Sequence, residues 1–92
     1  MLTVACIPAY NVEKTIVDVI KRSLNFVDKV IVCDDGSSDS TSKNAEFAGA
    51  VLIKHEKNLG KGAALKSLFK YARENKADVI VTIDGDGQFL PE

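Results

Sequence analysis

The feature that most constrains the fold of this chain is a set of four short runs rich in valine and isoleucine. The runs are Leu2–Ile7, Val30–Cys33, Ala50–Ile53 and Val79–Ile83. Within each run the apolar residues are nearly continuous and do not alternate with polar residues. This pattern predicts strands that are buried on both faces, as in a parallel sheet covered by helices.

Stretches with helical periodicity separate these runs. In the first stretch, the residues at helical spacing are Val12, Ile16, Val19, Ile20 and Ser23. Asn11 is the expected N-cap of this helix. A shorter helix is expected over 40–48, and a longer one over 62–74 with its stop at Asn75. The order β-α-β-α-β-α-β predicts a Rossmann-like, doubly wound parallel sheet with strand order 3-2-1-4.

Composition limits the classes of protein that the chain can belong to. Its 92 residues are enough for a single domain, residues 1–92. The 12 Lys and Arg against 13 Asp and Glu give a net charge of −1, so nucleic-acid binding is not expected. Cys6 and Cys33 lie in apolar runs and are expected to be buried, reduced thiols. With no signal peptide and no run of about 20 apolar residues, we expect a soluble, cytoplasmic chain.

The unusual polar segments all follow the carboxyl ends of the predicted strands. These segments are residues 8–13, 34–39, 55–62 and 84–88. Open α/β sheets bind their ligands outside the carboxyl ends of the strands, where the strand order reverses. The opposite ends carry residues such as Asp28 and Asp78, which are expected only to be solvated. This distribution predicts one ligand site at the carboxyl edge of the sheet.

The last of these segments has the chemistry of a metal site. Asp84 and Asp86 are separated by Gly85 and come directly after an apolar strand, and Gln88 adds a neutral oxygen. Hard oxygen ligands suit Mg²⁺ or Mn²⁺, which keep positions open for substrate phosphates. A simple polar turn is the alternative, because Asp and Gly are common turn residues. The position after the strand favours the metal site.

Two other segments suit a nucleotide. Asp34 and Asp35 are adjacent at a strand end, and one of them can accept a hydrogen bond from a nucleobase or a ribose, with Asp35 the better candidate. Asp39 or Ser38 is expected to cap the next helix. Residues 60–62, Gly-Lys-Gly at a helix start, resemble a phosphate-binding turn, although a helix start with a solvated lysine is an equal alternative. The P-loop spacing is absent.

Taken in order, the four segments resemble those of glycosyltransferase family 2, whose enzymes have the GT-A fold. The first segment is similar to the family's Pro-x-Tyr-Asn-Glu-Glu, with Val12 in place of the first acid. The resemblance implies one set of residues for the nucleotide-sugar and one for the metal. The substrate-binding residues are Pro8, Ala9, Tyr10, Glu13, Asp35, Lys61, Asp84 and Gly85, and the metal ligands are Asp84, Asp86 and Gln88.

Residues 84–92 are most similar to the branch of the family that loads mannose or glucose onto polyprenyl phosphates, including dolichyl phosphate. The resemblance implies transfer of a hexose from GDP-mannose or a UDP-hexose, with Mg²⁺ or Mn²⁺ offsetting charge on the leaving diphosphate. A lipid acceptor would place the full-length protein at the cytoplasmic face of the membrane. The family's acceptor-side residues follow the metal motif, so no catalytic base is named in this chain.

Other functions are compatible with parts of the sequence. A haloacid-dehalogenase-like phosphatase also uses Asp-x-Asp-Gly, but it has Thr where Gln88 stands and carries the motif near its start. A receiver-type phosphoacceptor leaves residues 8–13 and 84–86 unexplained. A non-catalytic, truncated nucleotide-sugar-binding module is a third possibility. His55 has no metal-ligand partner at a useful spacing and is expected on the surface or in a loop, and no Ser/His/Asp arrangement is visible.

The fourth strand suggests how this chain behaves by itself. In the 3-2-1-4 order, Val79–Ile83 lies at the edge of the sheet, and the sequence ends soon after it. We expect the 92 residues to be part of a longer catalytic domain and to be inactive alone. Because an uncovered apolar edge tends to pair with another chain, self-association through the fourth strand is also expected.

Overall fold

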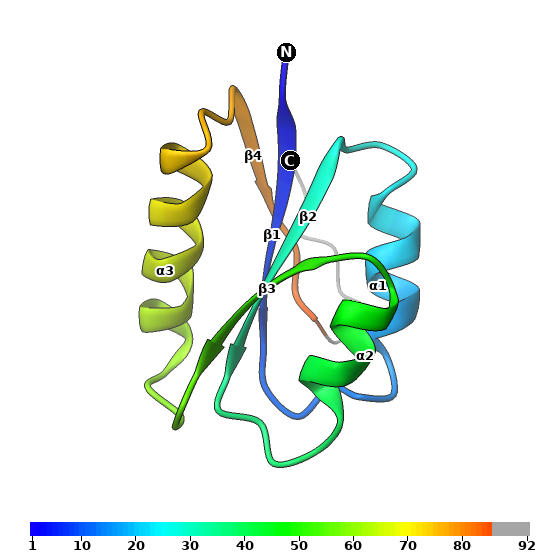
Figure 1. Ribbon diagram of the computed structural model, residues 1–92, viewed down its shortest axis with the longest axis vertical. Helices are drawn as coiled ribbons and strands as arrows, with labels where there is room; N and C mark the ends of the chain where they lie inside the picture. Colours follow the sequence, from blue (N-terminus) through cyan, green and yellow to red (C-terminus); the bar gives the residue numbers. More distant parts are fainter. Residues whose placement is uncertain (86–92) are drawn as a thin grey trace.

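A four-stranded parallel sheet runs through the centre of the molecule in the computed structural model, which describes residues 1–85 (Figure 1). The elements in chain order are β1 (Thr3–Ala9), α1 (Ile16–Ser23), β2 (Lys29–Asp35), α2 (Thr41–Phe47), β3 (Val51–His55), α3 (Lys61–Glu74) and β4 (Val79–Thr82). The strand order is β3-β2-β1-β4, and every neighbouring pair is parallel. The predicted element order and winding are confirmed.

The sheet is covered on both faces, which is why its strands are apolar without alternation. Helices α1 and α2 lie on one face and α3 on the other (Figure 1). In the central strand β1, Val4 and Cys6 pack against α3, whereas Ala5 and Ile7 pack on the side of α1. All four of these side chains are fully buried. Alternate residues of β1 therefore contribute to two apolar cores on opposite faces of the sheet.

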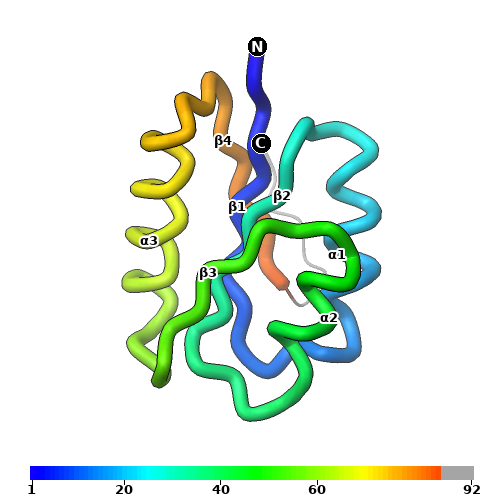
Figure 2. The backbone as a smooth tube through the Cα atoms, viewed as in Figure 1, coloured from blue at the N-terminus to red at the C-terminus, as the bar shows by residue number. Residues whose placement is uncertain are grey.

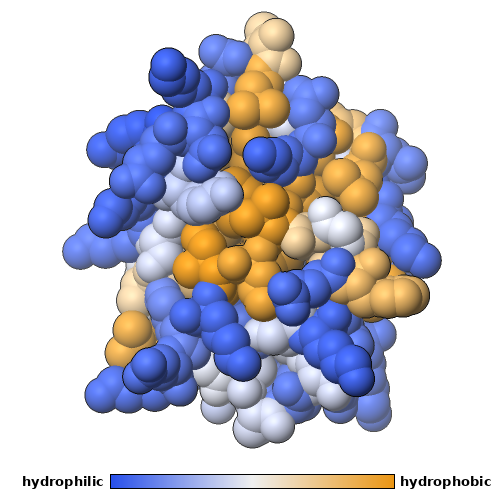
Figure 3. Space-filling model, in the orientation of Figure 1, coloured by the Kyte–Doolittle hydropathy of each residue, from blue (hydrophilic) through white to orange (hydrophobic). Residues whose placement is uncertain are grey.

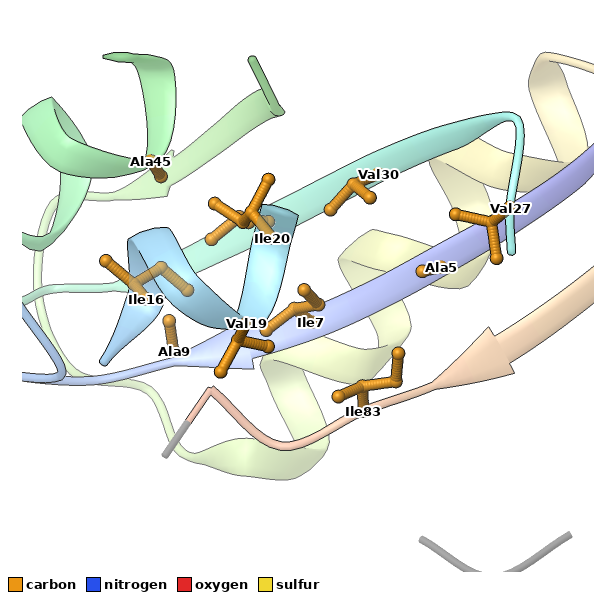
Figure 4. Packing of buried hydrophobic residues seen from close by; sticks show 11 residues of the cluster. Ala5, Ile7, Ala9, Ile16, Val19, Ile20, Val27, Val30, Ala45 and Ile83 are labelled. Carbon is orange, nitrogen blue, oxygen red and sulfur yellow. The ribbon is translucent and has the colours of Figure 1, made fainter. Parts of the chain in front are cut away.

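The larger core lies between the sheet and the two short helices. Figure 4 shows Ile16, Val19 and Ile20 of α1 above Ile7 of β1, with Ile83 beside them. Helices of 8 and 7 residues are too short to be stable alone, so this packing holds α1 and α2 in place. Figure 3 shows apolar side chains gathered between the two helical layers and hydrophilic ones over α3. Within residues 1–85, none of the helices has the length and apolar character needed to cross a membrane.

The predicted N-cap of the first helix is wrong. The helix begins at Ile16 with Thr15 at its N-cap, several residues after Asn11. Asn11 has a positive φ of 50°, and its side-chain oxygen accepts the amide of Ser38 at 2.9 Å. Its own amide donates to Ser37 Oγ at 2.8 Å. Asn11 thus joins two loops, because a short amide side chain can bond across a turn instead of capping a helix.

The other helix boundaries agree more closely with the sequence. Helix α2 begins at Thr41 after an N-cap at Ser40, and Asp39 Oδ1 accepts the Thr41 amide at 2.9 Å. Asp39, one residue before the N-cap, therefore accepts the hydrogen bond of the first helical amide. Helix α3 begins at Lys61, one residue before the predicted start, and has Asn75 at its C-cap, as predicted.

Strands β2 and β3 extend beyond the predicted apolar runs. Strand β2 ends at Asp35 and β3 at His55, and these two residues are partners in the parallel register. Pairing needs only backbone groups, so it continues where the side chains become polar. The expectation that His55 lies on the surface or in a loop is therefore wrong, and only 12% of its side chain is exposed.

Both cysteines are free and buried, as predicted. Burial raises the pKa of the Cys6 thiol to about 11. Burial, together with the charges of Asp35 and Asp34, raises the pKa of the Cys33 thiol to about 11 as well. Each thiol therefore stays protonated at neutral pH and behaves as a small core residue.

Candidate functional site

A cleft of about 390 Å³ opens at the carboxyl edge of the sheet, next to the start of α3. In Figure 2 the connections that follow β1, β2 and β3 come together at this lower end of the molecule. The cleft is lined by Pro8, Ala9, Tyr10, Val12, Asp35, Asn58, Gly60, Lys61, Ala64, Asp84 and Gly85. Its volume falls in the range of about 300 to 1,000 Å³ that is usual for small-molecule sites.

All the predicted substrate-binding residues except Glu13 line this cleft. Glu13 lies outside it, where its Oε1 accepts the Ser40 amide at 3.0 Å and its amide donates to Asp39 Oδ2 at 3.2 Å. Glu13 therefore links the β1–α1 connection to the start of α2. Among the predicted metal ligands, Asp84 is in the cleft, and Asp86 and Gln88 lie outside the described residues.

Opposite charges meet at the mouth of the cleft. Lys61 Nζ donates to Asp84 Oδ1 at 3.0 Å, with side-chain exposures of 60% and 22%. An ion pair this exposed contributes at most about 1 kcal/mol to stability. Lys61 is also the first residue of α3, whose N-terminus carries a partial positive charge. Breaking this ion pair therefore costs little free energy, and both side chains are available to a charged ligand.

Asp35 is the buried charge of the cleft, with 3% of its surface exposed. Its Oδ1 accepts from His55 Nδ1 at 2.7 Å and from the Leu59 amide at 3.0 Å, and its Oδ2 accepts the Gly60 amide at 2.8 Å. Burial acts to raise the pKa of Asp35, but these hydrogen bonds outweigh it and hold the pKa below its ordinary value. Asp35 is thus a carboxylate at neutral pH, and it fixes the turn that leads into α3.

The neighbouring Asp34 faces the other way, because successive strand residues point to opposite sides of a sheet. It is 1% exposed, and it accepts the Ser37 amide at 2.9 Å and the hydroxyl of Ser42. These bonds close the β2–α2 turn on the α2 side of the sheet. Of the two adjacent acids, only Asp35 lines the cleft.

Glycines let the loops around the cleft come into contact. Gly36 has a φ of +78°, and a Cβ atom at this position would lie 2.4 Å from the backbone nitrogen of Asn58. Gly85 is less closely packed: a Cβ there would lie 3.2 Å from Val12 Cγ2 and 3.3 Å from Pro8 O, and Thr15 Oγ1 donates to its carbonyl at 2.8 Å. The loops around the cleft therefore leave little room for a side chain at Gly36 and Gly85, whereas Gly60 has open space around it.

Two polar residues of this site, Asn58 and His55, were not among the predicted site residues. Asn58 lines the cleft, and His55 lies directly behind Asp35. The parallel register that pairs Asp35 with His55 could have indicated the second contact, because both residues end their strands. Hydrophobic periodicity locates strands but does not align them with one another.

The parallel sheet, its 3-2-1-4 winding and the polar cleft at its carboxyl edge define a Rossmann-like α/β domain of the GT-A type. The chain belongs to glycosyltransferase family 2, and the sequence pattern of that family matches residues 4–92.

Named relatives support this assignment. The chain is 38% identical to UDP-N-acetylglucosamine–dolichyl-phosphate N-acetylglucosaminyltransferase of Methanococcus voltae, over 94% of this chain and 41% of that protein. It is 31% identical to undecaprenyl-phosphate 4-deoxy-4-formamido-L-arabinose transferase of Pseudomonas fluorescens, over 94% of this chain and 28% of that protein.

A solved structure agrees in fold. Glucosyl-3-phosphoglycerate synthase from Mycobacterium tuberculosis, in complex with Mn²⁺, UDP and glucosyl-3-phosphoglycerate, is 33% identical with a TM-score of 0.72. The match covers 91% of this chain and 33% of that one. The same synthase has also been solved with Mg²⁺ and UDP. This chain spans less than half the length of each of these three proteins.

Proposed function

We propose that this chain is the donor-binding half of a metal-dependent glycosyltransferase, which transfers a hexose from GDP-mannose or a UDP-hexose to an acceptor. The observation that carries the proposal is the meeting of Asp35, Lys61 and Asp84 in one cleft. A nucleoside diphosphate sugar needs a polar partner for its base, a cation for its phosphates and a ligand for its metal. In this proposal Asp35 supplies the partner for the base, Lys61 the cation and Asp84 the metal ligand.

The base is bound at the inner end of the cleft in this proposal. Asp35 is ionised and held by three protein donors, so it can accept only an N–H or O–H group from a ligand. A nucleobase N–H is such a donor. Tyr10 lines the same cleft with half of its surface exposed, so its ring is available for contact with the nucleoside.

The phosphates and the metal are bound at the outer end. Lys61 and the first-turn amides of α3 attract phosphates. Asp84 offers a hard carboxylate oxygen beside them, and Mg²⁺ is usually held by one or two carboxylates plus substrate phosphates. Residues 1–85 contain no group of three His, Cys, Asp or Glu that could hold a metal, so Asp86 and Gln88 complete the proposed site. The bound metal would neutralise charge on the leaving diphosphate.

A polyprenyl phosphate is the acceptor class that we propose. The names of two relatives specify dolichyl phosphate and undecaprenyl phosphate. A phosphate acceptor is already anionic, unlike the hydroxyl acceptors that require a carboxylate base. A lipid acceptor also implies that the full-length protein works at the cytoplasmic face of a membrane.

Calorimetric titration with UDP-, GDP- and dTDP-sugars, with and without Mn²⁺, tests the donor proposal. We expect one nucleotide class to bind, and to bind more tightly with the metal. Failure of all three classes to bind would remove the proposal. Donor binding by the longer protein without any sugar transfer would instead indicate a non-catalytic nucleotide-sugar-binding module.

Self-association through β4 is a separate proposal. Strand β4 is an edge of the described sheet, and its residues Val79 and Ile80 are 40% and 39% exposed. An exposed apolar edge with unpaired amides can pair with a second copy. Light scattering over a concentration series should detect a dimer, and a glycosyl-transfer assay with polyprenyl phosphate should detect no turnover. A monomer at high concentration would contradict the edge argument.

A further inference from the structure

A relay of hydrogen bonds lies behind the cleft and involves none of the predicted ligand-binding residues except Asp35. His55 Nδ1 is 2.7 Å from Asp35 Oδ1, and His55 Nε2 is 2.9 Å from Ser67 Oγ on α3. The same Nε2 is 3.6 Å from Cys33 Sγ. Neither His55 nor Ser67 lines the cleft. The relay therefore contacts a ligand only through Asp35.

The position of the hydrogen between Asp35 and His55 follows from the charge of Asp35. Because Asp35 is a carboxylate, the hydrogen that it shares with His55 belongs to Nδ1. The Nε2 atom lies at hydrogen-bond distance from the Ser67 hydroxyl, which can either donate to a ring nitrogen or accept from it. The protonated thiol of Cys33 is a second, weaker neighbour of Nε2. The ring is therefore held by Asp35 at Nδ1 and by Ser67 at Nε2, with the Nδ1–H group donating to Asp35.

The relay also determines how much of Asp35 is left for a ligand. A carboxylate has about four lone-pair sites. Two on Oδ1 accept from His55 and the Leu59 amide, and one on Oδ2 accepts the Gly60 amide. The remaining site is on Oδ2 of a carboxylate that lines the cleft. Without His55, the carboxylate loses its side-chain partner and is held only by the backbone amides of Leu59 and Gly60, so its orientation is less well fixed.

We propose that His55 is a positioning residue for base recognition: together with Ser67, it holds Asp35 so that one acceptor site on Oδ2 faces a single N–H donor of the nucleobase. This inference rests on the donor-binding function proposed above. It goes beyond that function because it assigns base selectivity to two side chains outside the cleft.

Substitutions of His55 can separate its two contacts. The amide nitrogen of His55→Asn lies near the position of Nδ1 and can still donate to Asp35, whereas the amide of His55→Gln reaches toward Ser67. We expect His55→Asn to bind UDP or GDP, with Mg²⁺, within about threefold of wild type. His55→Gln should bind about tenfold more weakly, as expected for the loss of a hydrogen bond to a charged group.

Inorganic pyrophosphate with Mg²⁺ serves as the reference ligand, because it has no base. The positioning role predicts that His55→Gln weakens nucleotide binding but leaves pyrophosphate binding within about twofold of wild type. Ser67→Ala should reduce nucleotide affinity less than His55→Gln does. The matched control is Ser42→Ala, which breaks the bond to Asp34 on the other face of β2 and should change neither affinity.

A spectroscopic measurement tests the relay without any substitution. His55 is the only histidine of the chain, so the ¹⁵N shifts of its ring need no assignment. We expect Nδ1 to carry a hydrogen that is bonded to Asp35. A ring with no hydrogen on Nδ1, or equal loss of nucleotide and pyrophosphate binding in His55→Gln, would overturn the inference. If wild type bound pyrophosphate but neither UDP nor GDP, the donor proposal would fail together with the inference. If nucleotides bound equally well to wild type and to His55→Gln, only the inference would fail.

Discussion

The two ends of the sheet carry the same types of residue but use them differently. At the amino ends, Asp28 Oδ2 accepts the Thr3 amide at 2.8 Å and Asp78 Oδ2 accepts the Leu2 amide at 2.6 Å. Both acids are exposed, and they attach the start of β1 to the connections that precede β2 and β4. At the carboxyl ends, Asp34 and Asp35 are buried, and Asp35 joins β2 to the turn before α3.

The difference follows from the direction of the chain. In a β-α unit the carboxyl end of a strand leads to the N-terminus of a helix, where free amides and a partial positive charge stabilise an anion. An acid at that end can therefore be buried and still be ionised, as Asp35 is. Asp28 and Asp78 are exposed as expected, but each also accepts a backbone amide, which the sequence did not indicate. Within residues 1–85, buried charged side chains and a cleft occur together only at the carboxyl end of the sheet.

The largest effect that we expect from this comparison is steric. Gly36 at the carboxyl end and Gly49 at the amino end both have positive φ, but a Cβ at Gly36 meets backbone atoms at 2.4 Å whereas one at Gly49 meets nothing within 4 Å. Gly49→Ala should lower the free energy of unfolding by about 1 to 2 kcal/mol through backbone strain. Gly36→Ala should cost about 1 to 3 kcal/mol more through overpacking. Urea denaturation measures both, and equal losses would show that the loops do not interlock.

A smaller effect is expected on ligand affinity. Asp84→Asn removes a charge from the cleft, so Mg²⁺-dependent binding of UDP or GDP should weaken at least about tenfold. Asp78→Asn changes the acid that precedes the same strand at its other end, and it should alter the affinity by less than about twofold. Calorimetry of the two variants beside wild type gives the comparison. Similar losses in both would mean that the acids act through net charge and not through position.

The smallest effect concerns pH. Because the folded-state pKa of Asp35 is depressed, its contribution to stability is present above the unfolded value of about 3.9 and is lost as the pH falls through the folded pKa. Wild type should therefore lose more stability than Asp35→Asn between pH 6 and pH 3, by up to about 1 kcal/mol, because the loss begins only near the unfolded pKa of about 3.9. Thermal melts across this range measure the difference in stability between wild type and Asp35→Asn, which should shrink as the pH falls. A difference that stays constant would mean that the pKa of Asp35 is not depressed.

Much of the fold was predictable because burial on both faces leaves a clear pattern. The continuous apolar runs located all four strands, and the turn residues after them located the cleft. The start of α1 was missed, since Asn11 bonds to the loop after β2 and this partner is 27 residues away. His55 was missed for a similar reason: its environment depends on the alignment of β2 with β3.

The site was predictable to the extent that strand ends determine it. Pro8, Asp35, Lys61 and Asp84 gather in the cleft because each lies at or just beyond a strand end or at the start of a helix. Glu13 lies outside the cleft because the β1–α1 connection turns toward α2 before the helix begins. Side-chain direction within an irregular connection depends on contacts that residue spacing does not encode.

The proposed function requires that a nucleoside diphosphate binds at the carboxyl edge of the sheet and not elsewhere on the chain. Titration of ¹⁵N-labelled protein with UDP or GDP and Mg²⁺, followed by amide chemical shifts, tests this most directly. We expect shift changes centred on Tyr10, Gly60, Lys61 and Gly85, with the amides at the amino ends, such as that of Gly49, unchanged. Changes centred on the amino ends, or none at saturating nucleotide, would contradict it.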